Sequence, residues 1–230
     1  MLKSKMAQFL DESDLKLTVP FRLNVTGPSG VGKSHFVVRL IKNENYLLAT
    51  PSDSIIYFYN ELNPTIKKLE NNPKVTLKKG FDYDLILDNQ PTHHLLCVID
   101  DHMNAEIYHH LSELFAVKSR ALNISVCLLT QNIFSKGGNA RQFNRDILIN
   151  STHTCIFENK RDKLSVMSIA KASFPTKYKY FMDSYHSACD SFSNGHGYLF
   201  LSLSPQTNKK VELRTKIFFN EEVTILFWPR

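Results

Sequence analysis

The stretch VTGPSGVGKSHFVV, residues 25–38, constrains this chain more than any other. Its eight residues from Gly27 to Ser34 fit the pattern G-x-x-x-x-G-K-[S/T] at every fixed position. The alternating segment 21–27 before it predicts a strand, and the apolar spacing over 33–43 predicts a helix. A glycine-rich loop between a strand and a helix is the context in which this motif binds phosphate. The sequence therefore predicts a nucleotide-binding site.

Each part of this loop has a predicted role. Its glycines allow backbone N–H groups to curl toward phosphate oxygens, and the helix that follows adds the positive end of its dipole. Lys33 is predicted to reach the β- and γ-phosphates of ATP, and the Ser34 hydroxyl to bind Mg²⁺. The residues predicted to contact the nucleotide are Gly27, Pro28, Ser29, Gly30, Val31, Gly32, Lys33, Ser34 and His35.

Strand and helix patterns alternate from residue 21 to about residue 160. The run 94–101 is apolar at almost every position before its two acids, which is typical of a parallel strand covered on both faces. This alternation predicts an α/β fold with a mostly parallel central sheet flanked by helices. Strands are predicted at 21–27, 54–60, 74–80, 94–101, 123–132 and 152–158, and helices at 33–43, after Pro64, and at 104–122, 140–151, 161–174 and 177–189. The segment 82–91 fits neither pattern clearly.

The length of 230 residues and a hydrophobic share of 43% suit one domain with its own core. We expect an N-terminal arm at 1–20 and a single nucleotide-binding domain at 21–230. The core of that domain is predicted at about 21–160, with accessory helices and a hairpin at about 161–230. The four cysteines lie mostly in apolar runs without a C-x-x-C pair, which predicts buried, reduced thiols.

The chain lacks the features of secreted and membrane proteins. Its first residues hold no apolar core of signal-peptide length, and no apolar run approaches the roughly 18 residues of a membrane span. We therefore expect a soluble, intracellular protein without a membrane partner. The formal net charge of +6 is compatible with a nucleic-acid partner but does not identify one.

Two acids, Asp100 and Asp101, close the predicted strand 94–101. At the tip of a strand neighbouring the loop strand, Asp100 is predicted to hold Mg²⁺ together with Ser34. Asp101, directly after it, is predicted to orient or deprotonate a water molecule that attacks the γ-phosphate. A plain helix N-cap is the structural alternative for Asp101. The paired acids favour hydrolysis over transfer to a bound hydroxyl.

Further polar side chains are candidates for the same reaction. Gln131 ends the apolar strand 123–132 and has both donor and acceptor atoms with which to sense the γ-phosphate. Arg120, Arg141 and Arg145 are candidates for an arginine that acts on the site of a neighbouring subunit. For each of them, an ordinary surface charge is the alternative.

Two segments bear on nucleic-acid contact. The glycine-rich, basic loop 135–140 could touch a DNA backbone, or it could be a simple surface turn. In KYKYF, residues 177–181, aromatic and basic residues alternate, as in segments that stack on bases. The structural interpretation, which we favour, is that Tyr178 and Phe181 pack inward while the lysines face solvent.

The order of GPSGVGKS, LLCVIDD, a helix ending in KSR, and NISVCLLTQN resembles the FtsK/HerA-type ATPases. These belong to the additional-strand, RecA-like P-loop NTPases. Within them, the chain is most similar to the viral genome-packaging ATPases of poxviruses, other large DNA viruses, virophages and Maverick/Polinton elements. NISVCLLTQNIF carries the closest likeness, SIIYFYNEL agrees with it, and the resemblance covers about residues 21–160.

This resemblance implies a Walker A loop at Gly27–Ser34, a Walker B pair at Asp100 and Asp101, and a sensor at Gln131. It implies an ATP hydrolase that assembles into a pentameric or hexameric ring and moves double-stranded DNA into a capsid. The implied partners are DNA and capsid portal or vertex proteins, at the viral assembly site in the host cytoplasm or nucleus, or in the virion. One departure is that many members carry Glu where this chain has Asp101.

Two other functions stay open at the level of sequence. A nucleoside or nucleotide kinase would share the loop, but the acid pair and the missing arginine-rich lid disfavour it. A nucleotide switch that recruits partners would also share the loop. The absence of an N-K-x-D sequence disfavours a guanine-specific switch of that kind.

Overall fold

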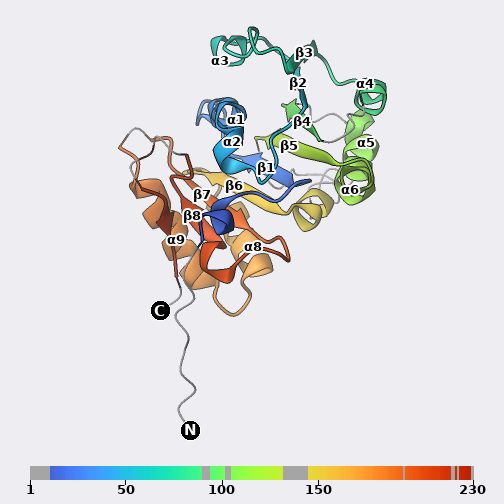
Figure 1. The fold of residues 1–230 in the computed structure, drawn as a ribbon. Coiled ribbons are helices and arrows are strands. Elements are labelled where there is room, and N and C mark those ends of the chain that lie inside the picture. Colours follow the sequence, from blue (N-terminus) through green and yellow to red (C-terminus); the bar gives the residue numbers. More distant parts are fainter. Residues whose placement is uncertain are drawn as a thin grey trace.

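A computed structural model describes residues 11–89, 94–101, 105–131, 145–193, 195–218, 221 and 223–228. These residues build one nine-stranded sheet in the order β3-β2-β4-β5-β1-β6-β7-β8-β9, with helices on both faces (Figure 1). The strands are β1 Arg22–Thr26, β2 Ser54–Tyr59, β3 Val75–Lys79, β4 Leu95–Asp100, β5 Ile124–Thr130, β6 His153–Phe157, β7 Tyr198–Ser202, β8 Leu213–Thr215 and β9 Ile225–Leu226.

The helices and helical turns separate these strands along the chain. They are η1 Glu12–Leu15, α1 Lys33–Lys42, α2 Glu44–Leu47, α3 Pro64–Lys67, α4 Tyr83–Asp88, η2 Ala105–Ile107, α5 Tyr108–Glu113, η3 Leu114–Lys118, α6 Ser119–Ala121, α8 Lys163–Ser173, α9 Tyr178–Asp190 and η4 Lys209–Val211. Residues 145–150 are also helical.

The six strands from β3 to β6 in this order all pair in parallel. The predicted mostly parallel α/β sheet is therefore confirmed. One detail of the sequence analysis is wrong, because β4 with its two acids does not neighbour the loop strand β1. Strand β5 lies between them, with Val98 opposite Cys127 on one side and Leu23 opposite Cys127 on the other. An inserted strand at this position defines the additional-strand P-loop fold.

Alternation along each buried strand sends side chains to two separate hydrophobic layers. In β4, Leu96 and Val98 pack against α1, α2 and α3, whereas Leu95, Cys97 and Ile99 pack against α4, α5 and η3. The second face continues beyond β1, where α8 and α9 cover β6, β7 and β8 (Figure 1). The helices therefore cover both faces and leave the strand ends open to form sites.

The C-terminal part extends the sheet with antiparallel strands. β7 pairs with β6, and β8 and β9 follow. The predicted hairpin is confirmed, although its second strand keeps only Leu213–Thr215 because η4 occupies the preceding residues. As predicted, Phe181 is buried and the lysines of KYKYF are exposed, while Tyr178 is partly buried.

Two other predicted segments differ in detail. The predicted helix 104–122 is a succession of η2, α5, the π-helical η3 and α6, and the ambiguous segment 82–91 contains α4. Within the expected arm 1–20, Leu17 is buried and its backbone pairs with that of Leu48. Residues 1–10 of that arm lie outside the described residues.

The four cysteines are buried and free, as predicted. Within the part of the chain that the structure describes, no helix is both long and apolar enough to span a membrane.

Candidate nucleotide-binding and catalytic site

The phosphate-binding loop starts where β1 ends and leads directly into α1. Gly30 and Gly32 have φ angles of 82° and 104°, in the left-handed region that glycine adopts without steric cost. Gly32 is the N-cap of α1, so the first N–H groups of the helix have no intrahelical acceptor and can bind an anion. At Gly27 a side chain is excluded, since an added Cβ would lie 2.7 Å from Cβ of Phe157 in β6.

Lys33 is folded against the backbone of its own loop. Its Nζ donates to the carbonyl oxygens of Gly27 at 2.8 Å and Pro28 at 2.9 Å. Burial lowers the pKa of Lys33, whereas the carboxylates of Asp100 and Asp101 act in the opposite direction. The ammonium group is thus held inside the loop, facing the two acids.

Asp100 lies at the carboxyl end of β4 and accepts two hydrogen bonds on the same oxygen. Ser34 Oγ and Tyr57 Oη both donate to Asp100 Oδ2, each at 2.8 Å. Burial raises the pKa of Asp100, and the two hydrogen bonds partly counteract this. The chain thereby brings Ser34 from α1 to an acid two strands away, across about 10 Å of sheet.

The oxygens of Ser34 and Asp100 fit a divalent cation. A hydroxyl and a carboxylate oxygen 2.8 Å apart are hard ligands of the kind that Mg²⁺ prefers, and Mg²⁺ needs few protein ligands when phosphates supply others. The pair therefore suits the predicted Mg²⁺ role.

Asp101 is held next to this pair by two amides. It is exposed, and its φ angle of 59° is rare outside glycine, so the carboxylate is turned out of the strand direction. Gln131 Nε2, just beyond β5, donates to both Asp101 carboxylate oxygens at 2.9 Å. Asn60 Nδ2, just beyond β2, donates to the Asp101 carbonyl at 2.6 Å. Residues that follow the two strands on either side of β4 thus fix the backbone and the solvent-facing carboxylate of Asp101.

These groups line one cleft of about 580 Å³, which we call the catalytic cleft. It brings together most of the predicted site. Its lining residues are Ser29, Gly30, Gly32, Lys33, Ser34, His35, Tyr59, Asn60, Glu61, Asn63, Thr65, Asp100, Asp101 and Gln131.

The two candidate arginines among the described residues, Arg120 and Arg145, do not line the catalytic cleft of their own chain. Arg120 lies in α6, shortly before the amino end of β5, and so at the sheet edge opposite the loop. Arg145 is exposed at the start of the helical residues 145–150. Arg141 and the loop 135–140 lie outside the described residues. Their proposed roles toward a neighbouring subunit or DNA stay predictions.

Two residues that contact the acid pair were not predicted from the sequence. Tyr57 is fully buried in β2 and binds Asp100, while Asn60 follows the same strand and binds Asp101. The polar end of SIIYFYN was a visible signal for Asn60. Nothing in the sequence marked Tyr57, because a tyrosine in an apolar strand is usually a core residue.

The chain is similar to several solved structures but to no known sequence family. No protein-family model matches the chain, and no curated protein sequence matches it significantly. Among solved structures, the genome-packaging NTPase B204 from Sulfolobus turreted icosahedral virus 2, in complex with ATP-gammaS, is similar over 91% of this chain and 97% of its own, at 10% identity and a TM-score of 0.47.

Two bacterial proteins are similar over part of their length. EssC (ATPases 2 and 3) from Geobacillus thermodenitrificans matches at 12% identity and a TM-score of 0.44, over 64% of this chain and 34% of that one. EccC (ATPases 2 and 3) of Thermomonospora curvata, in complex with a signal sequence peptide, matches at 14% identity and a TM-score of 0.43, over 62% and 31%. This chain thus spans about one third of each. The strand order and the loop before α1, rather than these likenesses, identify the fold as that of a P-loop NTPase.

Proposed function

We propose that this chain is a Mg²⁺-dependent ATP hydrolase that drives double-stranded DNA into a viral capsid. The observation that supports hydrolysis is the position of Asp101, a solvent-facing carboxylate fixed beside Asp100 and opposite Lys33 in one cleft. The two aspartates come from the carboxyl end of β4 and Lys33 from the start of α1, and all three converge where the γ-phosphate of a nucleotide in the loop would lie.

In this proposal the loop N–H groups and Lys33 bind the β- and γ-phosphates. Ser34 and Asp100 would hold Mg²⁺, which when bound neutralises charge on the phosphate oxygens. Lys33 leaves the Gly27 and Pro28 carbonyls for the phosphates, where its charge stabilises the transition state.

Asp101 then acts on the attacking water. A carboxylate oxygen accepts one water proton while the water oxygen bonds to the γ-phosphorus, and the bond to the β-phosphate oxygen breaks to give ADP and phosphate. Gln131 holds both Asp101 oxygens, so it positions the base. Gln131 also lines the same cleft, so in this proposal the predicted sensor of the γ-phosphate contacts the base directly.

The DNA-related part of the proposal comes from the sequence resemblance and the net charge of +6. It includes a homo-oligomeric ring, contact with capsid portal or vertex proteins, and activity at the assembly site in the host cell or in the virion. In such a ring, Arg120 or Arg145 of one subunit would reach the phosphates bound by the next.

ATP hydrolysis by the purified chain, with and without double-stranded DNA, tests the proposal. We expect DNA to stimulate hydrolysis, and Lys33→Ala and Asp101→Asn each to lower the rate by about 100-fold or more. Asp101→Asn should keep nucleotide affinity, whereas Lys33→Ala should lose it. Lys42→Ala in the same helix and Asp88→Asn in α4 are exposed controls that should hydrolyse ATP normally.

Particular results would contradict each part. If the chain transfers phosphate to nucleosides and DNA does not change its rate of ATP hydrolysis, the proposed DNA-translocating activity is wrong. An unchanged rate in Asp101→Asn would remove Asp101 from the mechanism. Only monomers in the presence of ATP and DNA, by mass photometry, would overturn the ring.

A further inference from the structure

A second cleft, of about 760 Å³, lies on the other side of the loop from the catalytic acids. The two clefts share Gly32 and His35, at the point where the loop becomes α1. We call the second one the C-terminal cleft, because most of its wall comes from residues beyond 190. Its other lining residues are Phe36, Arg39, Phe157, Ser191, Phe192, Ser193, His196, Tyr198, Lys216, Phe218 and Glu221.

The lining of the C-terminal cleft combines aromatic rings with cations. Phe36 packs edge-on against Tyr198 and Phe218, with ring centroids 5.1 Å apart in both pairs. Phe192 is only partly buried, and Lys216 Nζ lies 5.5 Å from the centre of its ring. A wall of this kind suits a flat, aromatic ligand that carries negative charge at one end.

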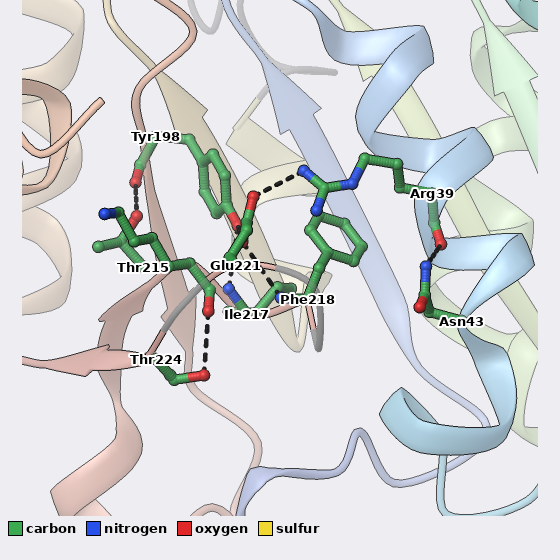
Figure 2. A network of polar contacts seen from close by, with 9 residues as sticks. Arg39, Asn43, Tyr198, Thr215, Ile217, Phe218, Glu221 and Thr224 are labelled. Atoms are coloured by element: carbon green, nitrogen blue, oxygen red, sulfur yellow. Dashed lines mark hydrogen bonds and ion pairs between the residues drawn. The ribbon is translucent and has the colours of Figure 1, made fainter. Parts of the chain in front are cut away.

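The wall is held in place by an ion pair between α1 and the C-terminal segment (Figure 2). Arg39 Nη1 lies 2.6 Å from Glu221 Oε1, and the guanidinium sits 4.1 Å above the Phe218 ring. The other Glu221 oxygen accepts from Tyr198 Oη at 3.1 Å and from the Phe218 N–H at 3.2 Å. The segment around Phe218 is thus fixed to the same helix that begins at the phosphate loop.

His196 links this wall to the loop itself. Its Nδ1 is 2.9 Å from the carbonyl oxygen of Val31, and an added Cβ at Gly32 would lie 3.5 Å from the same nitrogen. A ligand with its phosphates in the loop therefore passes Gly32 and His196 before it enters the C-terminal cleft.

We propose that the C-terminal cleft binds the base and ribose of the nucleotide, with the base stacked on Phe192. This inference rests on the proposed function, because it needs the phosphates in the loop. The continuity of the two clefts at Gly32 and His35 supports it, as does the aromatic lining on one side and the polar, acidic lining on the other. The C-terminal region, which carries no motif, thereby becomes part of the nucleotide site.

Comparing a nucleotide with its phosphate chain alone tests this proposal. Binding of ATP-gammaS and of inorganic tripolyphosphate, both with Mg²⁺, is measured by calorimetry. We expect Phe192→Ala to weaken ATP-gammaS binding about tenfold or more and to leave tripolyphosphate binding within about twofold. Phe192→Tyr, which keeps the ring, should bind both ligands normally.

Tyr178→Ala is the matched control. Tyr178 is also a partly buried aromatic next to a lysine, with Lys171 Nζ 5.8 Å from the ring, but it does not line the cleft. It should change neither affinity. If Phe192→Ala does not fold, Phe192→Leu keeps an apolar side chain without the aromatic face and should still weaken ATP-gammaS several-fold.

The two proposals fail in different ways. Unchanged ATP-gammaS affinity in Phe192→Ala and Phe192→Leu, or equal weakening of both ligands in them, would overturn the base site and leave the catalytic cleft intact. Failure of the unaltered chain to bind either ligand would overturn the proposed function and this inference with it.

Discussion

The two clefts beside the start of α1 are built in different ways. The catalytic cleft takes its acids and amides from the carboxyl ends of parallel strands, one or two residues from each. The C-terminal cleft takes most of its wall from the turn after α9, the start of β7 and the segment after β8, and the rest from α1 and from Phe157 of β6.

This difference shows how the fold distributes its chemistry. The carboxyl ends of parallel strands all lie at one edge of the sheet. Polar residues that follow buried strands therefore come together there without specific contacts between distant segments. The strand order does not bring the residues of the C-terminal wall together in this way. Their positions depend on packing between residues far apart in the chain. We therefore expect changes in the C-terminal half to act through stability or affinity, and changes in the catalytic cleft to act through rate.

The largest expected effect on stability lies where β6, at the end of the parallel part of the sheet, pairs with the antiparallel strand β7. His153 is buried there, opposite Ser202, with Ser202 Oγ 3.0 Å from its Nδ1. Burial, together with the positive charges of nearby Arg214 and Arg22, lowers the pKa of His153 to about 3. The folded state therefore binds fewer protons than the unfolded state, whose histidine has a pKa of about 6.5.

The contribution of His153 to stability is complete above pH ~6.5 and is lost as pH falls toward 3. The loss is about 1.4 kcal/mol per pH unit and about 5 kcal/mol over the whole range. Urea unfolding from pH 7 to pH 4 measures this slope, and His153→Gln should have a shallower one. An imidazole NMR signal of His153 that titrates near pH 6.5 in the folded protein would contradict the prediction.

A smaller effect is expected where the C-terminal wall is attached to α1. Glu221→Gln keeps the shape of the side chain but removes the charge that faces the partly buried Arg39 (Figure 2). We expect a loss of about 2 kcal/mol, or about 4–8 °C in Tm, since a charged hydrogen bond in a partly buried site is replaced by a neutral one.

Glu158→Gln provides the comparison for this change. Its pair with Lys160 spans 3.6 Å and the lysine is exposed, so its removal should cost less than about 0.5 kcal/mol. Equal Tm values for both variants would show that the ion pair of Arg39 does not hold the wall.

The smallest expected effect on stability lies in the catalytic cleft. Tyr57→Phe removes the hydroxyl that donates to Asp100 while keeping the buried ring. We expect a loss of about 1 kcal/mol in stability. We also expect the Mg²⁺ concentration for half-maximal hydrolysis to rise about tenfold, because Tyr57 orients a proposed metal ligand.

Tyr83→Phe removes the same kind of bond at a distant place, where the hydroxyl donates to Glu113 at 2.7 Å. It should leave the Mg²⁺ requirement unchanged. If both variants have the same Mg²⁺ dependence as the original chain, Tyr57 has only a structural role.

Prediction from the sequence worked best where short-range patterns decide the structure. The loop, the acid pair and Gln131 could be placed at strand ends, because buried runs and glycine spacing mark where β1, β4 and β5 stop. The order of strands could not be obtained from local patterns. Hydrogen bonding between strands joins residues that are far apart in the chain. The acid-bearing strand β4 was therefore expected beside β1, whereas β5 lies between the two.

The sequence by itself determined the phosphate loop, the α/β class and the type of residue at each strand end. The tertiary structure alone decided the partners: Tyr57 on Asp100, Asn60 and Gln131 on Asp101, and Glu221 on Arg39. The physical reason is that a motif encodes backbone shape over a few residues. A contact between elements depends on how buried side chains fill the space between them, which no single segment specifies.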